Sequence, residues 1–167
     1  MENTKNTENK ELPGKRVADS YTENVQILLQ STMNGYNRLY GGKLLEWIDM
    51  LAAVVARRHC GMNVTTAAID NLQFKEPAYL NDIIIMSGRI TYTGNTSMEI
   101  RVDTVAESLD GTRRLINRAY LVIVAIDENG HPVKVPPLII ETEEERAEYE
   151  AAKKRREYRQ KRRLENF

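Results

Sequence analysis

The 167-residue sequence has little cysteine or histidine, no long apolar run and no excess of either charge. Its single cysteine, Cys60, excludes an intramolecular disulfide and a cysteine-rich zinc site. Two histidines, His59 and His131, are too few for a histidine-based centre, so we expect no metal. Lys plus Arg and Asp plus Glu both number 24, so net charge favours neither nucleic acid nor a membrane surface as partner.

A membrane-spanning helix needs roughly 20 apolar residues in a row, and no segment of this sequence approaches that length. The first twenty residues are polar, with mixed charge, and contain no apolar signal region. The sequence therefore predicts a cytoplasmic protein with a disordered lead-in over residues 1–20.

Most of the remaining sequence consists of alternating apolar segments separated by turn residues, a pattern typical of antiparallel sheets. One helix is expected over Lys43–His59, with Gly61 as its C-terminal cap. The predicted fold class is α+β, with an antiparallel sheet wrapped around this central helix. The strands are expected over Asn24–Gln30, Asn63–Phe74, Asp82–Tyr92, Thr96–Ser108 and Arg113–Ile126.

The predicted central helix is apolar on nearly every face. Between Leu44 and Ala56 its only charged side chains are Glu46 and Asp49. A helix of this kind is expected to be surrounded by protein. Because one helix cannot cover a whole sheet, an edge and a face stay open, and we expect an oligomer.

The composition changes sharply near the end of the chain. From Glu141 to Leu164 an acidic half precedes a basic half, which matches the helix dipole. Thr142 and Glu145 have the spacing of a capping box. These features predict a long solvated helix, frayed at its end, so we divide the rest of the chain into a domain over 21–138 and a charged tail over 139–167.

Asp49 is the first candidate functional residue. A carboxylate among apolar neighbours has to be ionised and hydrogen-bonded, or be held neutral by desolvation. Either state suits a general base or a nucleophile, but a structural Asp that caps a loop or pairs with an Arg fits equally well. Gly41-Gly42 at the helix start adds backbone N–H donors for a carbonyl oxygen that becomes negative. Together these groups are sufficient for hydrolysis of an activated ester.

The spacing of Asn34, Gly41-Gly42 and Asp49 (N-x6-GG-x6-D) resembles the hotdog-fold acyl-CoA thioesterases of the cytosolic acyl-CoA hydrolase type. The resemblance extends over roughly Val25 to Leu138. It implies an enzyme of lipid metabolism that releases CoA and a carboxylic acid from acyl-CoA, without a separate cofactor. It also implies a homodimer with the active site at the interface, and a hexameric trimer of dimers.

The resemblance also assigns roles to single residues. Asp49 takes the position of the catalytic Asp, as general base or nucleophile. Asn34 takes that of a loop Asn that acts across the dimer interface, and Gly41 and Gly42 take those of the oxyanion donors. Asn37 stands where Gly is expected and tolerates the same left-handed backbone.

The turn Gly94, Thr96 and Ser97 is expected to meet pantetheine or phosphate through its hydroxyl and amide groups. Asn95 takes a position where Arg or Lys is common, so one phosphate contact is expected to be missing. Taken singly, each arginine of the strands is more simply an exposed residue, but together they are candidate phosphate partners. These are Arg89, Arg113, Arg114 and Arg118.

Two other functions fit parts of the same sequence. A hotdog hydratase or dehydratase usually has a catalytic His near the helix, and His59 lies at the wrong end. A non-catalytic binding or scaffold protein would use the basic segment 153–163 to hold RNA or acidic partners, although the acidic half opposes this. The thioesterase is the favoured prediction.

Overall fold

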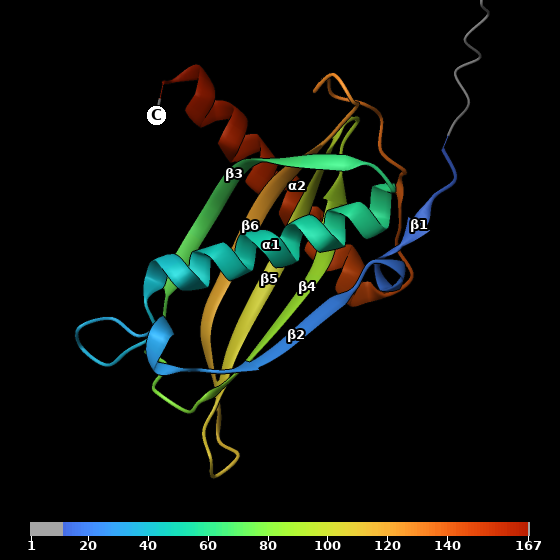
Figure 1. Cartoon of the computed structure of the whole chain (residues 1–167). Coiled ribbons are helices and arrows are strands. Elements are labelled where there is room, and N and C mark those ends of the chain that lie inside the picture. The colour runs from blue at the N-terminus through green and yellow to red at the C-terminus, as the bar shows by residue number, and fades with distance from the viewer. Residues whose placement is uncertain (1–11, 167) are drawn as a thin grey trace, which may run out of the picture.

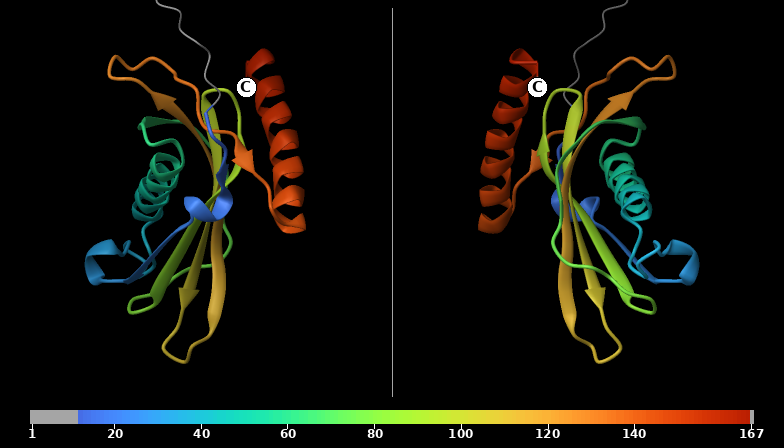
Figure 2. Two further views of the ribbon diagram at one scale, coloured as in Figure 1. Left: turned by 90° about the vertical axis from the view of Figure 1, so that its right-hand side faces the viewer. Right: turned by 90° about the vertical axis from the view of Figure 1, so that its left-hand side faces the viewer.

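The computed structural model describes residues 12–166, which form a five-stranded antiparallel sheet with one helix on each face (Figures 1 and 2). The strand order in the sheet is β2-β4-β5-β6-β3. This arrangement is the predicted α+β architecture. The elements are β1 (Lys15–Arg16), β2 (Thr22–Ile27), α1 (Gly41–Cys60), β3 (Asn63–Phe74), β4 (Ile83–Thr93), β5 (Ser97–Glu107), β6 (Arg113–Ile126), β7 (Leu138–Ile139) and α2 (Glu143–Leu164), with single 3-10 turns at Val17–Asp19 and Gln30–Thr32.

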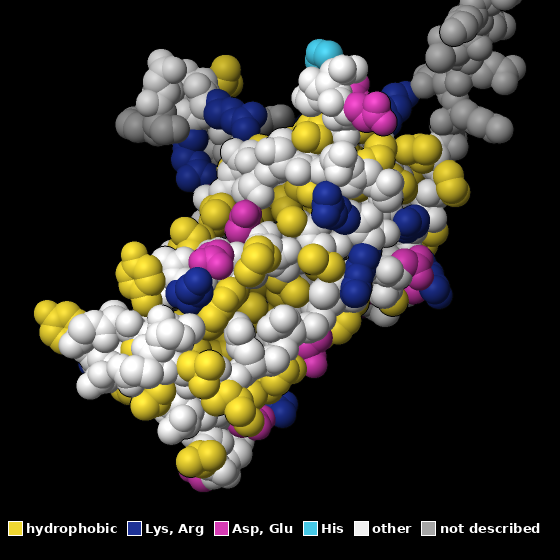
Figure 3. Space-filling model, viewed as in Figure 1, with side chains coloured by type: hydrophobic (Ala, Val, Ile, Leu, Met, Phe, Trp, Pro, Cys, Tyr) yellow, Lys and Arg dark blue, Asp and Glu magenta, His cyan; other side chains and the backbone are white. Residues whose placement is uncertain are grey.

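The inner face of α1 forms the core with the sheet. Leu44, Ile48 and Val55 recur on this face and are buried. The helix ends at Gly61, whose φ of 67° confirms the predicted left-handed cap. The outer face is open, however, and Met50 is 52% exposed and Val54 40%. The prediction that protein surrounds α1 is therefore wrong for the single chain, and Figure 3 shows apolar side chains gathered along this side.

α2 lies against the outer face of the sheet, opposite α1 (Figure 2). Thr142 Oγ1 accepts from the Glu145 N–H and the Glu145 side chain accepts from the Thr142 N–H, which confirms the capping box. The prediction of a solvated helix is wrong, because Ala152 is completely buried and α2 arginines bond to a carboxylate of the sheet. One face of α2 therefore packs on the sheet, while most of its other residues are exposed.

The second half of the predicted lead-in is ordered. β1 pairs in parallel with β7, Lys15 opposite Leu138, and the Lys15 ammonium donates to Arg58 O at 3.0 Å. Val17 is 7% exposed. Residues 12–20 thus contradict the prediction of a disordered segment, and 1–11 lie outside the described residues. In the part of the chain that the structure describes, neither helix is long and apolar enough to cross a membrane.

Candidate active site

Asp49 lies midway along α1, on the side that faces β3. The hydroxyl of Thr66 donates to Asp49 Oδ1 at 2.7 Å. Asp49 is half-buried, and it forms no ion pair with any residue between 12 and 166. The alternative in which Asp49 is a structural residue paired with an Arg is therefore not found among these residues. Thr66 holds Oδ1 of the carboxylate and leaves Oδ2 free, as a general base or nucleophile requires.

Thr66 is the site residue that the sequence interpretation missed. It lies on β3 opposite Ile123 of β6, at a bulge between Thr66 and Ala68 that locally re-aims the strand. Threonine is common in strands, so only the fold distinguishes this hydroxyl from its neighbours.

The start of α1 holds free backbone donors. The N–H groups of Lys43 and Leu44 both bond to Tyr40 O, whereas those of Gly41 and Gly42 have no acceptor in the described chain. First-turn N–H groups of a helix are the ones left without intrahelical partners. A Cβ on Gly42 would lie 2.7 Å from the Tyr40 ring, so a larger residue at this position would require the ring to move. The predicted oxyanion donors are thus exposed at the helix end.

Asn34 organises the loop before α1. Its Oδ1 accepts from the N–H groups of Tyr36 at 2.9 Å and Arg38 at 3.2 Å. The turn includes Asn37 with a φ of 55°, the left-handed backbone expected there. The Asn34 side-chain NH₂ has no partner among the described residues, and Asn34 lines a hollow of about 280 Å³ together with Phe74.

Asn34 and Asp49 are not brought together within one chain. Asp49 follows Gly41 by eight residues, which is about 12 Å along the helix axis. The hollow at Asn34 is lined by Leu44 of the first helical turn but not by Asp49. One chain therefore places Asn34 beside the first turn of α1, and the carboxylate with Thr66 midway along the helix.

The turn expected to contact CoA joins β4 to β5. Its Gly94 N–H donates to Ser97 O at 2.7 Å, and Thr96 O accepts from the Ala125 N–H. Arg113 pairs with Glu107 at the other end of β5, ten residues or about 33 Å away along the strand.

The predicted arginines do not gather at this turn, and each contacts a carboxylate of its own chain. Arg89 pairs with Glu144 at 3.4 Å. Arg114 pairs with Asp82 at 2.9 Å. Their role in phosphate binding stays a prediction.

His59 does not supply an acid or base near Asp49. It is fully buried at the C-terminal end of α1, and its Nε2 lies 2.9 Å from Pro136 O. Burial, the largest effect, lowers the pKa of His59, so the ring is neutral near pH 7. The site therefore offers a carboxylate, a hydroxyl and backbone donors, but no imidazole.

This geometry, together with comparisons with known proteins, decides the family. A family model of the thioesterase superfamily matches residues 36–111. The solved structure of a hexameric acyl-CoA thioesterase superposes with a TM-score of 0.88 at 38% identity, covering 90% of this chain and 97% of that one. The chain belongs to the hotdog acyl-CoA thioesterase family. The predicted hotdog fold is thereby confirmed.

Two other relatives of this chain have names that state an activity or a bound ligand. An uncharacterized acyl-CoA thioester hydrolase of Bacillus subtilis, YkhA, is 41% identical over 113 residues, 67% of this chain and 66% of that protein. An acyl-CoA hydrolase of Staphylococcus aureus, solved with butyryl coenzyme A, coenzyme A and coenzyme A disulfide, has a TM-score of 0.86 at 31% identity, over 92% of this chain and 94% of that chain. Further structures of that hydrolase carry alanine in place of one asparagine, aspartate or threonine. The chain spans only 33% of the length of the mammalian cytosolic acyl coenzyme A thioester hydrolases that it also matches.

Proposed function

We propose that this protein hydrolyses acyl-CoA thioesters to free CoA and a carboxylic acid, with Asp49 as general base or nucleophile. The observation that carries the proposal is the hydrogen bond from Thr66 Oγ1 to Asp49 Oδ1. The residues replaced in the S. aureus hydrolase are an asparagine, an aspartate and a threonine, separated by 15 and 17 residues. Asn34, Asp49 and Thr66 have the same separations in this chain.

The chemistry follows from these groups. Asp49 takes a proton from water, and the oxygen attacks the thioester carbon. The carbonyl oxygen becomes an oxyanion, which the N–H groups of Gly41 and Gly42 stabilise. The C–S bond then breaks, and the CoA thiolate leaves and is protonated. In the alternative route Asp49 attacks the carbon directly, and water cleaves the resulting anhydride.

The first test is release of free CoA, followed with a thiol reagent over substrates from acetyl- to palmitoyl-CoA. We expect enzyme-dependent release with at least one chain length in this panel. Absence of release across the panel, with folded protein, would contradict the proposed function.

A complete site requires a second copy of the chain, because Asn34 and Asp49 lie apart within one. β3 supports such an assembly, since among the described strands it pairs only with β6 and its other edge is open. Two copies related by a two-fold axis can pair these edges antiparallel, which continues the sheet and removes the open edge. The exposed apolar face of α1 adds surface that a neighbour would cover. The proposed unit is a homodimer with shared sites, and three such dimers form the proposed hexamer.

Complementation between two inactive variants tests the shared site. Asn34→Asp keeps the Oδ1 acceptor of the turn but loses the NH₂ donor, and Asp49→Asn loses the carboxylate. A mixed dimer then has one doubly altered site and one intact site, so we expect up to half of wild-type turnover, reduced by any dimers of a single variant within the purified hexamers. The two variants are co-expressed with different tags and purified through both.

The same variants purified alone are the matched controls and are expected to be nearly inactive. If Asn34 and Asp49 act within one chain, every chain in the mixture is defective. Activity of the mixed dimer no higher than that of either variant alone would therefore exclude the shared site.

A further inference from the structure

A second candidate binding site lies on the outer face of the sheet, under the C-terminal half of α2. Figure 2 shows the β4–β5 turn beside this part of the helix. Here α2 and the sheet enclose a hollow of about 160 Å³, which we call the α2 pocket. It has room for several water molecules at roughly 30 Å³ each. Its lining includes Tyr92, Ser97, Arg156, Arg159, Gln160 and Arg163.

The three arginines of the α2 pocket differ in how their charges are balanced. Arg159 is neutralised within the chain, by Glu99 at 2.7 Å and Asp70 at 3.3 Å. Arg156 contacts only the ring of Tyr92, 5.8 Å from its centroid. The guanidinium group of Arg163 lines the pocket and has no hydrogen-bond or ion-pair partner among residues 12–166. Two guanidinium groups therefore face one hollow without a counter-charge.

Acidic groups nearby do not supply the missing counter-charge. Glu99 is the only carboxylate that lines the α2 pocket, and its oxygens accept from Arg155, Arg159 and Thr91. Asp70, next to it, is bound by Arg159 and Arg162. Both carboxylates are already used to hold α2 on the sheet, so the pocket keeps a net positive charge.

Neutral donors complete the pocket. The hydroxyl of Ser97 and the side-chain amide of Gln160 lie in the lining and have no partner among the described residues. Gly94 keeps the Ser97 hydroxyl accessible, because a Cβ on Gly94 would lie 3.0 Å from it. Two forked cations with neutral donors between them match a doubly charged oxyanion better than a single carboxylate.

We infer that the α2 pocket binds a phosphate or diphosphate group through Arg156 and Arg163. Two sources of this chemistry are distinguishable. One is the phosphate-bearing end of CoA, a case that rests on the proposed function; the other is a separate phosphorylated ligand.

Calorimetric titration with inorganic diphosphate at low salt tests the site itself. We expect saturable binding to the wild type, weakened about tenfold in Arg156→Gln and in Arg163→Gln, because each loses a charge-assisted hydrogen bond. Lys154→Gln is the control, since Lys154 is exposed on the same helix and outside the pocket. No saturable binding to the wild type, or equal weakening in Lys154→Gln, would overturn the inference. Circular dichroism checks that each variant is folded.

Steady-state kinetics then identify the source. If the phosphates belong to CoA, both arginine variants raise KM for acyl-CoA about tenfold and leave KM unchanged for the acyl-N-acetylcysteamine thioester, which has no phosphate. If KM is unchanged for both substrates while diphosphate binding is lost, the ligand is a separate molecule. The binding result does not depend on turnover, so failure of the proposed function is distinguishable from failure of this site.

Discussion

Asp49→Asn is expected to lower the turnover number by about 10²–10⁴-fold, the range that a positioned general base contributes. The amide cannot take a proton from water, and it cannot attack the thioester carbon. It still offers an oxygen to the Thr66 hydroxyl, which donates to Asp49 Oδ1 at 2.7 Å. The variant should therefore fold normally. Free CoA release and thermal unfolding are measured on the same preparation.

Glu46→Gln is the matched control for this loss of a carboxylate. Glu46 lies three residues before Asp49 on α1, is exposed and pairs only with Lys43. Its replacement should leave turnover unchanged. If Asp49→Asn retains more than half of wild-type turnover while folded, Asp49 is not the catalytic carboxylate.

Incorporation of isotope into Asp49 identifies the anhydride route. Turnover in ¹⁸O-water labels the Asp49 side chain only if an anhydride forms and water attacks its aspartyl carbon. With direct attack of water, the label enters the carboxylic acid product alone. Mass spectrometry of the peptide that contains Asp49 reads the difference.

The sheet and central helix were predicted well because their signals are local. β3 and β6 begin and end at the predicted residues, where alternating apolar side chains meet turn residues. α1 was predicted over Lys43–His59 and extends over Gly41–Cys60. In each case the period of the apolar pattern and the flanking Gly or Asn decide the element.

The position of α2 could not be predicted, because a helix of its composition is stable in either of two environments. A helix rich in Arg and Glu is stable in solvent through pairs along its own surface, and equally stable on a sheet that offers carboxylates. Glu99 decides between them, yet within β5 it alternates with Met98 and Ile100 like any exposed polar residue. Only the fold reveals that this side of β5 is covered.

The residues of the candidate site also differ in whether a local sequence pattern reveals them. Asp49 was found from sequence because a carboxylate is unusual in an apolar helix. Thr66 was not found, because nothing along β3 distinguishes it from Thr65, the other threonine of the strand. Pairing between Asn34 and Asp49 depends on a second chain, which no local pattern describes.

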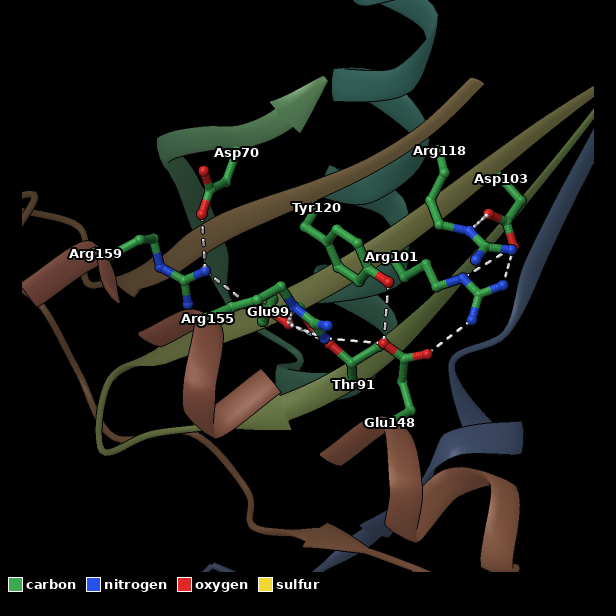
Figure 4. A network of polar contacts seen from close by, with 10 residues as sticks. All are labelled: Asp70, Thr91, Glu99, Arg101, Asp103, Arg118, Tyr120, Glu148, Arg155 and Arg159. Carbon is green, nitrogen blue, oxygen red and sulfur yellow. Dashed lines mark hydrogen bonds and ion pairs between the residues drawn. The ribbon is translucent and has the colours of Figure 1, made fainter. Parts of the chain in front are cut away.

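Replacement of Glu99 is expected to give the largest loss of stability. Glu99 is 2% exposed and accepts from Arg155 at 2.8 Å, Arg159 at 2.7 Å and Thr91 at 2.8 Å, as Figure 4 shows. Glu99→Leu leaves Arg155 with only Glu148, and Arg159 with only Asp70, as carboxylate partner beneath α2. Removal of one member of a buried ion pair costs about 3–5 kcal/mol.

Neighbouring ion pairs predict how the wild type responds to acid. Burial would raise the pKa of Asp103 and Glu148, but hydrogen bonds from arginines, Arg101 among them, outweigh it and lower both pKa values. A lowered pKa means that the folded state favours the ionised carboxyl group. This stabilisation is present above the ordinary carboxyl pKa of about 4 and is lost as pH falls through the folded-state pKa. Acid should therefore release α2 as the loss of Glu99 does.

Urea unfolding of Glu99→Leu, Glu99→Gln and the wild type at neutral pH measures the effect. Glu99→Gln keeps one acceptor and should lie between the other two. Limited trypsin digestion reports the detachment of α2 directly, because its many Lys and Arg residues become accessible. Glu150→Gln is the control, since Glu150 pairs only with Lys153 on the exposed side of the same helix. If Glu99→Leu unfolds at the wild-type urea concentration and α2 stays resistant to trypsin, apolar packing, not the Glu99 ion pairs, holds α2 on the sheet.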